Sequence, residues 1–404
     1  NLSLTTTDSD GVKSAESSLT LEIDAVAPVA PTAGLDADAD TGVIGDNLTS
    51  DTTPTIAGAS AGSGDTIAVS IDGGEVLTTT VADDGTWSVT PGTALASGNT
   101  ELTVNATDVA GNVSADTTLI VQIDTSAPTA PNATLDGGSD TGVTGDGLTS
   151  NTKPTISGSA ATSGDTITVR VADGEVLTTT VAANGTWSVT PTVGLEEGET
   201  DLSITATDPA GNRSAATTVT VQIDAVAPAA PLAALDGGSD TGVIGDGMTN
   251  NAKPTISGSA ASSGDTITVT IPDGEVLTST VAANGTWSVT PTVALDGGET
   301  EISVTATDAA GNVSAATTLI VSVDTTAPLA PAAVLDASVD TGVSGDGITS
   351  NTKPTISGST ASGGDTITVT VPGGEVLTTT VASNGTWSVT PTVAMNDGET
   401  ELSI

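Results

Sequence analysis

Apolar and polar residues alternate along short stretches of this chain, and small-residue turns separate the stretches. Within residues 125–224 the alternating stretches lie at 154–160, 165–171, 175–181, 186–190, 200–208 and 214–224. Alternation with a period of two is typical of β-strands that bury one face. A shorter stretch at 133–135 adds a seventh strand, and no stretch combines helical periodicity with helix caps. The pattern predicts an all-β sandwich.

Two turns suggest how some of these strands pair. Asn184-Gly185 separates 175–181 from 186–190, and Asn-Gly favours the positive φ angles of a tight hairpin turn. We therefore expect these two strands to form a hairpin. The stretches 200–208 and 214–224 are expected to pair in the same way around Pro-Ala-Gly-Asn-Arg.

The whole pattern repeats every 100 residues. The segment GTWSVTP begins at 85, 185, 285 and 385, with no insertion or deletion between the copies. One hundred residues match one complete immunoglobulin-like sandwich of about seven strands, and they exceed the length of a solenoid unit. The sequence predicts tandem immunoglobulin-like β-sandwich domains in an elongated rod.

The repeat fixes the expected domain boundaries. The predicted units are 1–24 (the last two strands of a preceding repeat), 25–124, 125–224, 225–324 and 325–404, which lacks its last strand. Each junction carries Ala-Pro and a second Pro three residues later, which stiffen an extended linker. An arbitrary cut from a longer array explains the partial ends. Alternatively, end strands complete neighbouring chains by β-augmentation.

Composition excludes several function classes. Fifty Asp and Glu against six Lys and Arg give a formal net charge of -44, so nucleic acid and anionic membrane surfaces are not expected partners. The chain has no Cys and no His, which removes thiolate chemistry, Cys-zinc sites and the commonest general base. No apolar run approaches the length of a membrane span. We do not expect an enzyme.

Acidic residues recur at fixed places in each repeat. They lie in the T-D-x-A-G-N turn, at the end of the last strand before the linker, after the first strand, and in the DTGVxGD loop. Even the diverged segment 1–24 keeps Asp8 and Asp24. The candidate metal ligands are Asp24, Asp36, Asp40, Asp46, Asp108, Asp124, Asp136, Asp140, Asp146, Asp208, Asp224, Asp236, Asp240, Asp246, Asp308, Asp324, Asp336, Asp340 and Asp346.

Sandwich topology would bring these residues together at the joints between repeats. The linker entry and the last hairpin turn share one end of a domain, so Asp208 should lie beside Asp124. The loop after the first strand lies at the opposite end and should approach Asp224 and, from the next repeat, Asp308. Up to five carboxylates per joint would repel one another, and oxygen ligands in loops suit Ca²⁺ better than Mg²⁺.

Other interpretations of the same residues are structural. Aspartates in turns often only cap backbone amides, and this is the favoured interpretation for Asp65, Asp165, Asp265 and Asp365. The single Trp of each repeat could stack on a glycan, but a lone indole among small aliphatic residues is expected to fill the core. These residues are Trp87, Trp187, Trp287 and Trp387.

Taken together, the VxIDxxAPxAP linker, the DTGVxGDxxT loop, KPTISGSA, NGTWSVTP and the TATDxAGN turn resemble the bacterial immunoglobulin-like repeats of giant non-fimbrial, RTX-type adhesins. The resemblance covers the whole chain. It implies type I secretion, display at the bacterial cell surface, roles in adhesion or biofilm formation, and calcium at the joints. Val12 replaces the turn Asn found at 112, 212 and 312, so the first joint is expected to be weaker.

These observations predict a function for the chain. The leading prediction is an extracellular stalk, stiffened by calcium, that contacts a host or abiotic surface only through domains outside this chain. Its direct partners would be neighbouring repeats of the same chain. The alternatives are repeats that themselves bind host glycans or proteins, and a subunit of a self-assembling extracellular filament.

Overall fold

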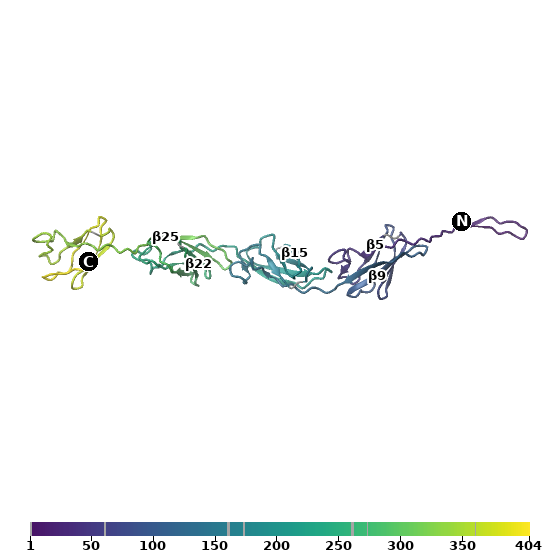
Figure 1. The fold of residues 1–404 in the computed structure, drawn as a ribbon, viewed down its shortest axis with the longest axis horizontal. Coiled ribbons are helices and arrows are strands. Elements are labelled where there is room, and N and C mark those ends of the chain that lie inside the picture. Colours follow the sequence, from purple (N-terminus) through teal and green to yellow (C-terminus); the bar gives the residue numbers. More distant parts are fainter. Residues whose placement is uncertain are drawn as a thin grey trace.

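The computed structural model describes residues 2–59, 62–159, 162–172, 174–259, 262–272, 274–359 and 361–404. They form strands, turns and extended linkers, which confirms the predicted all-β class. The repeats follow one another along the long axis of the molecule, with the N-terminal hairpin at one end (Figure 1). The described residues include no helix long and apolar enough to cross a membrane.

Each complete repeat is a sandwich of two sheets, shown here for residues 125–224. One sheet has five strands in the order β12-β18-β17-β14-β15, and the other has three in the order β11-β13-β16. The strands are β11 (Thr134–Leu135), β12 (Leu148–Thr149), β13 (Ile156–Gly158), β14 (Thr166–Val171), β15 (Val176–Thr180), β16 (Trp187–Val189), β17 (Gly198–Thr207) and β18 (Thr217–Ile223).

The other repeats have the same arrangement. Residues 25–124 contain β3 (Gly34–Leu35), β4 (Leu48–Thr49), β5 (Ile56–Ala59), β6 (Thr66–Ile71), β7 (Val76–Thr80), β8 (Thr86–Val89), β9 (Gly98–Thr107) and β10 (Thr117–Ile123). Residues 225–324 contain β19 (Ala234–Leu235), β20 (Met248–Thr249), β21 (Ile256–Ser259), β22 (Thr266–Thr270), β23 (Val276–Thr280), β24 (Thr286–Val289), β25 (Gly298–Thr307) and β26 (Thr317–Val323).

The two ends hold fewer strands. In residues 1–24, β1 (Leu2–Leu4) and β2 (Ser17–Leu19) pair as an antiparallel hairpin. The strands of residues 325–404 are β27 (Val334–Leu335), β28 (Ile356–Gly358), β29 (Thr366–Thr370), β30 (Val376–Thr380) and β31 (Trp387–Val389).

Alternation along the strands builds the core of each repeat. In β14 the side chains of Ile167, Val169 and Val171 are buried while Thr166 and Arg170 are exposed. These residues pack with others from both sheets in one hydrophobic cluster that lies within residues 125–224. Separate clusters fill the other three repeats. Because each cluster stays within one repeat, each repeat has a core of its own, as expected for a domain.

The structure corrects one predicted pairing. Asn184-Gly185 does form a tight turn, in which the amide of Gly185 donates to the carbonyl of Ala182 at 2.9 Å. However, β15 lies in the five-stranded sheet and β16 in the three-stranded sheet, so the turn crosses between sheets. The antiparallel partner of β15 is β14. The other predicted pair, β17 with β18, is confirmed.

A short strand that the alternation did not reveal ties the long loop to the linker. β12 pairs in parallel with the end of β18. The carbonyl of Thr149 accepts a hydrogen bond of 3.0 Å from the amide of Asp224, and that of Gly147 accepts one of 2.9 Å from Gln222. The loop after the first strand therefore ends beside the linker to the next repeat, as the topology predicts.

Candidate functional site

At the entry end of each repeat, one asparagine holds the turn Asp and the linker Asp together. In residues 125–224 the Asn212 Nδ2 donates to Asp208 Oδ2 at 3.0 Å and to the carbonyl of Asp124 at 2.8 Å. The same pair of bonds links Asn112 to Asp108 and Asp24, and Asn312 to Asp308 and Asp224. The turn therefore lies beside the linker entry, where the sequence predicts it.

This hydrogen bonding also affects the acidity of the turn aspartate. The side-chain hydrogen bond from Asn112 lowers the pKa of Asp108 below its ordinary value, because it stabilises the charged form. In the first segment Val12 has no side-chain donor, and only its backbone contacts Asp8: its amide donates to Asp8 Oδ1 at 2.9 Å and its carbonyl accepts from the amide of Asp8 at 3.0 Å. The turn at Asp8 thus lacks the amide side chain that the other turns use to grip the linker.

At the other end of the repeat, the aspartates of the long loop mainly cap backbone amides. Asp136 Oδ1 accepts from the amide of Gly138 at 3.0 Å, and Asp146 Oδ1 accepts from Leu148 at 2.9 Å. Asp140 Oδ2 accepts from Gly145 at 2.5 Å. Equivalent bonds recur in the other repeats. These caps engage one oxygen of each aspartate, and the Ser157 Oγ donates to the second oxygen of Asp136, Oδ2, at 3.2 Å.

The long loop of one repeat contacts the turn of the next. The Thr141 Oγ1 donates to the carbonyl of Ala310 at 2.5 Å, and the amide of Val143 donates to Ala309 at 3.2 Å. Residues 41–43 make the same contacts with residues 209–210. The predicted approach of the loop to the following repeat is thus found at two joints.

One loop aspartate in each repeat keeps an oxygen without a partner. The Oδ1 atoms of Asp40, Asp140, Asp240 and Asp340 are buried and have no hydrogen-bond partner among the described residues. The side chains of Asp40 and Asp240 are only 4% and 9% exposed. A buried, unpartnered carboxylate oxygen is costly unless a cation or a donor reaches it. The donor chemistry fits a hard cation such as Ca²⁺.

The structure adds an acidic residue that the sequence assigned only to capping. Asp265 does cap its turn, accepting from the amide of Ser262 at 3.2 Å. However, its side chain is only 5% exposed. Burial raises the pKa of Asp265, and the negative charges of Asp308 and Asp224 raise it further. Three carboxylates from separate segments therefore influence one another at the entry end of this repeat.

The same feature occurs one repeat earlier. Asp165 is 2% exposed, and its Oδ2 has no partner among the described residues. Burial raises the pKa of Asp165, with a contribution from the charge of Asp208. The sequence signal was the recurrence of Gly-Asp before this strand, but the burial that distinguishes these aspartates comes only from tertiary packing.

The predicted ligands do not form a complete carboxylate cage. Across the residues that the structure describes, no group of three or more His, Cys, Asp or Glu side chains is placed to hold one metal ion. The structure thus brings the loop and turn backbones together without gathering up to five carboxylates around one point. Calcium binding by the predicted aspartates stays a prediction.

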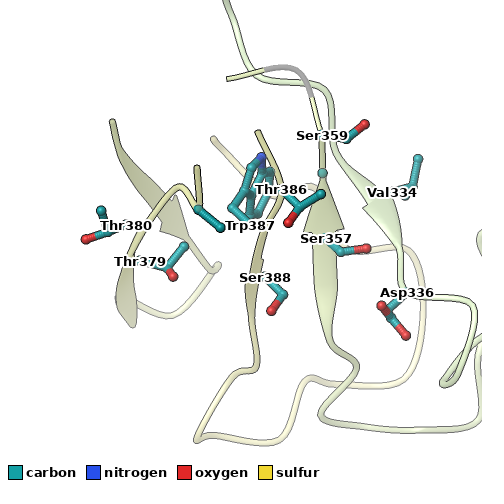
Figure 2. A pocket seen from close by; sticks show the side chains of 11 residues that line it. Val334, Asp336, Ser357, Ser359, Thr379, Thr380, Thr386, Trp387 and Ser388 are labelled. Atoms are coloured by element: carbon teal, nitrogen blue, oxygen red, sulfur yellow. The ribbon is translucent and has the colours of Figure 1, made fainter. Parts of the chain in front are cut away.

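The tryptophan of each repeat lies in the core rather than on the surface. All four indoles are only 4% exposed. Trp387 helps to line an open groove of about 600 Å³, together with small residues and hydroxyls such as Thr380, Thr386 and Ser388. Figure 2 shows these side chains. A similar groove lies over Trp187. Because so little of each indole is exposed, the indoles offer no broad platform on which a sugar could stack.

Comparisons with known proteins agree with this architecture. The model of a family described as bacterial Ig-like domain matches residues 27–125, 127–225, 227–325 and 326–404. No curated protein matches the chain significantly.

Several solved structures resemble the chain. A tetra-tandem repeat from the extending region of a large adhesion protein is 22% identical over 91% of each chain, with a TM-score of 0.28. A structure from a 1.5-MDa bacterial ice-binding adhesin is 28% identical over 74% of this chain and 99% of that chain, with a TM-score of 0.31. The four family matches together cover almost all of residues 27–404, and the chain therefore belongs to the bacterial Ig-like domain family.

Proposed function

We propose that this chain is a spacer: an extender segment of a bacterial cell-surface adhesin that holds a distal binding domain away from the cell. The observation that carries the proposal is the head-to-tail contact in which the loop at 141–143 of one repeat meets the turn at 309–310 of the next. A row of sandwiches joined in this way gives length and direction. Contact with a host or abiotic surface, in adhesion or biofilm formation, is assigned to domains outside this chain.

Calcium at the joints is the second part of the proposal. Two sets of residues support it: the loop aspartates with an unpartnered Oδ1, such as Asp140, and the acidic groups of the entry end, such as Asp224, Asp265 and Asp308. A bound Ca²⁺ would neutralise part of their mutual repulsion and cross-link the segments that carry them. A chain with a formal net charge of -44 has much repulsion to offset.

The alternative functions have less support. A glycan-binding repeat would be favoured by an exposed aromatic face, and all four indoles are buried. General acid–base catalysis would have to rely on carboxylates and a few Lys residues, because the sequence has neither His nor Cys. The spacer is therefore proposed as a non-enzymatic, extracellular structural element.

Small-angle X-ray scattering of the 404-residue chain tests both parts. Particles with the profile of an extended rod are expected in calcium and in chelator, and a compact globule in both would contradict the spacer. Calcium is expected to increase the maximum dimension and stiffness relative to chelator, with Mg²⁺ as the ionic control. Identical curves with calcium and with chelator would contradict calcium stiffening.

A further inference from the structure

In two repeats, a glycine of the long loop lies against the next repeat with no room for a side chain. Gly142 has a φ of +72°, and a Cβ at this position would lie 2.0 Å from the carbonyl oxygen of Ala309 and 2.8 Å from the amide nitrogen of Gly311. Gly42 has a φ of +79°, and its Cβ would lie 2.0 Å from the carbonyl oxygen of Pro209. At both joints the backbone of the loop therefore packs directly on the backbone of the turn.

The groups that form this contact are uncharged. The hydrogen bonds use backbone amides, backbone carbonyls and the hydroxyl of Thr41 or Thr141. Ala310, which accepts one of them, is fully buried, whereas the equivalent Ala110 is exposed. The contact accordingly buries neutral surface and needs no counter-ion.

Both halves of the contact keep the same local hydrogen bonds in the copies that are not docked, although the φ of Gly342 (+96°) departs from that of Gly142 (+72°). In the undocked loop, Gly242 keeps a φ of +81°, and Gly245 donates to Asp240 Oδ2 at 2.5 Å, the distance found in the docked loop. In the undocked turn, the amide of Asp108 donates to Asn112 at 3.0 Å, as Asp208 does to Asn212 in the docked turn. Preorganised partners lose little entropy on association.

From these observations we infer that successive repeats are aligned by a metal-independent docking contact, in which the Thr-Gly-Val segment of one repeat binds the Ala-Gly turn of the next. The inference rests on the proposed spacer function and deepens it, since it names the partner of the loop as the following repeat. Calcium then adds to an alignment that the backbone already specifies. Glycine at 42 and 142 is required because any side chain would separate the two backbones.

The chain offers a matched pair of variants for the test. Gly142→Ala introduces a Cβ into the docked contact, whereas Gly242→Ala introduces the same backbone strain at a loop where a Cβ meets nothing within 4 Å in the described part of the chain. Thr141→Val and Thr241→Val form a second pair, which removes the hydroxyl without changing the backbone requirement. Comparing the members of each pair separates docking from effects on the folding of one repeat.

The chain contains no Cys, so cysteines at two exposed turn positions, Ala183 and Ala283, would carry spin labels that report the distance between neighbouring repeats. The distances are measured by pulsed electron spin resonance on the 404-residue chain in excess chelator. We expect one narrow distance distribution for the labelled parent chain and for the control variants at 241 and 242. The variants at 142 and 141 are expected to lose the narrow peak, with an unchanged circular dichroism spectrum.

Two results would overturn the inference. One is a narrow distribution for Gly142→Ala in chelator, which would show that the contact does not align the repeats. The other is an equally broad distribution for the parent chain in chelator, which would show that only a metal does so. Calcium titration of the same samples tests the proposed function separately. If the distance distribution of no variant responds to calcium, calcium stiffening is contradicted while the docking contact still stands.

Discussion

Replacing Asn312 with Ala tests whether the two side-chain hydrogen bonds of this asparagine, at the entry end, stabilise a repeat. The substitution removes the hydrogen bond of 2.7 Å from Asn312 Nδ2 to the carbonyl of Asp224 and the bond of 2.9 Å to Asp308 Oδ2. The first joins neutral groups and contributes about 1 kcal/mol, and the second is assisted by charge and contributes about 1.5–3 kcal/mol. Because Asn312 is only partly buried, the low end applies to both, and the expected loss is about 2–3 kcal/mol.

A loss of this size is readily measured. For a domain of this length it corresponds to a fall of roughly 10–20 °C in the melting temperature. Hydrogen exchange analysed by mass spectrometry along a urea titration assigns the unfolding transition to residues 225–324 rather than to another repeat. Val313→Ala is the control, since Val313 is 56% exposed and exposed substitutions usually change stability by less than about 0.5 kcal/mol. If Asn312→Ala lowers the free energy of unfolding by no more than this control does, the two hydrogen bonds of Asn312 do not stabilise the repeat.

Three further predictions follow from burial, packing and charge. Trp287→Ala should lower the free energy of unfolding, measured by urea denaturation, by about 3–5 kcal/mol, because the indole is 4% exposed. A decrease under about 1 kcal/mol would contradict a role of the indole in the core. Gly158→Ala should lower the melting temperature, because its Cβ would lie 2.0 Å from a backbone oxygen and 2.6 Å from an indole carbon, whereas Gly137→Ala has open space and should not. Asp265→Asn should raise the free energy of unfolding of the metal-free chain at pH values above the raised pKa of Asp265, because the buried carboxylate is charged there, and the advantage should shrink as pH falls through that pKa. At a calcium concentration of about a hundred times the Kd of the site, the free energy of unfolding of the parent chain should rise by about 2.7 kcal/mol, and that of the Asp265→Asn chain by clearly less. Equal increases would exclude Asp265 as a calcium ligand.

The sequence predicts a feature well when neighbouring residues along the chain determine it. Alternation located β14 and β17 within about two residues, because a half-buried strand imposes its period on the residues themselves. The two residues of β12 are too few to show a period. Asn184-Gly185 specifies a turn but not whether its flanking strands enter one sheet or two, since that choice depends on packing across the sandwich.

At the candidate site too, some features follow from the sequence and the topology, and others appear only in the packed structure. The approach of the loop to the next repeat could be predicted, because sandwich topology fixes which turns share an end. The role of Gly142 could not, since the need for a missing side chain appears only when a second backbone passes at contact distance. Asp265 resembles any turn-capping aspartate in the sequence, and only its burial beside two other carboxylates sets it apart.

The docking contact also offers a physical reason for the constant period of 100 residues. A sandwich alone tolerates insertions in its surface loops. In residues 125–224, however, the loop at 141–143 contacts the following repeat while the turn at 209–211 receives the loop of the preceding one. An insertion in either segment would displace a contact on a neighbour as well as a local turn. Because a head-to-tail interface that does not close on itself gives an open array, such repeats extend the molecule without any new interface, and its length depends on their number.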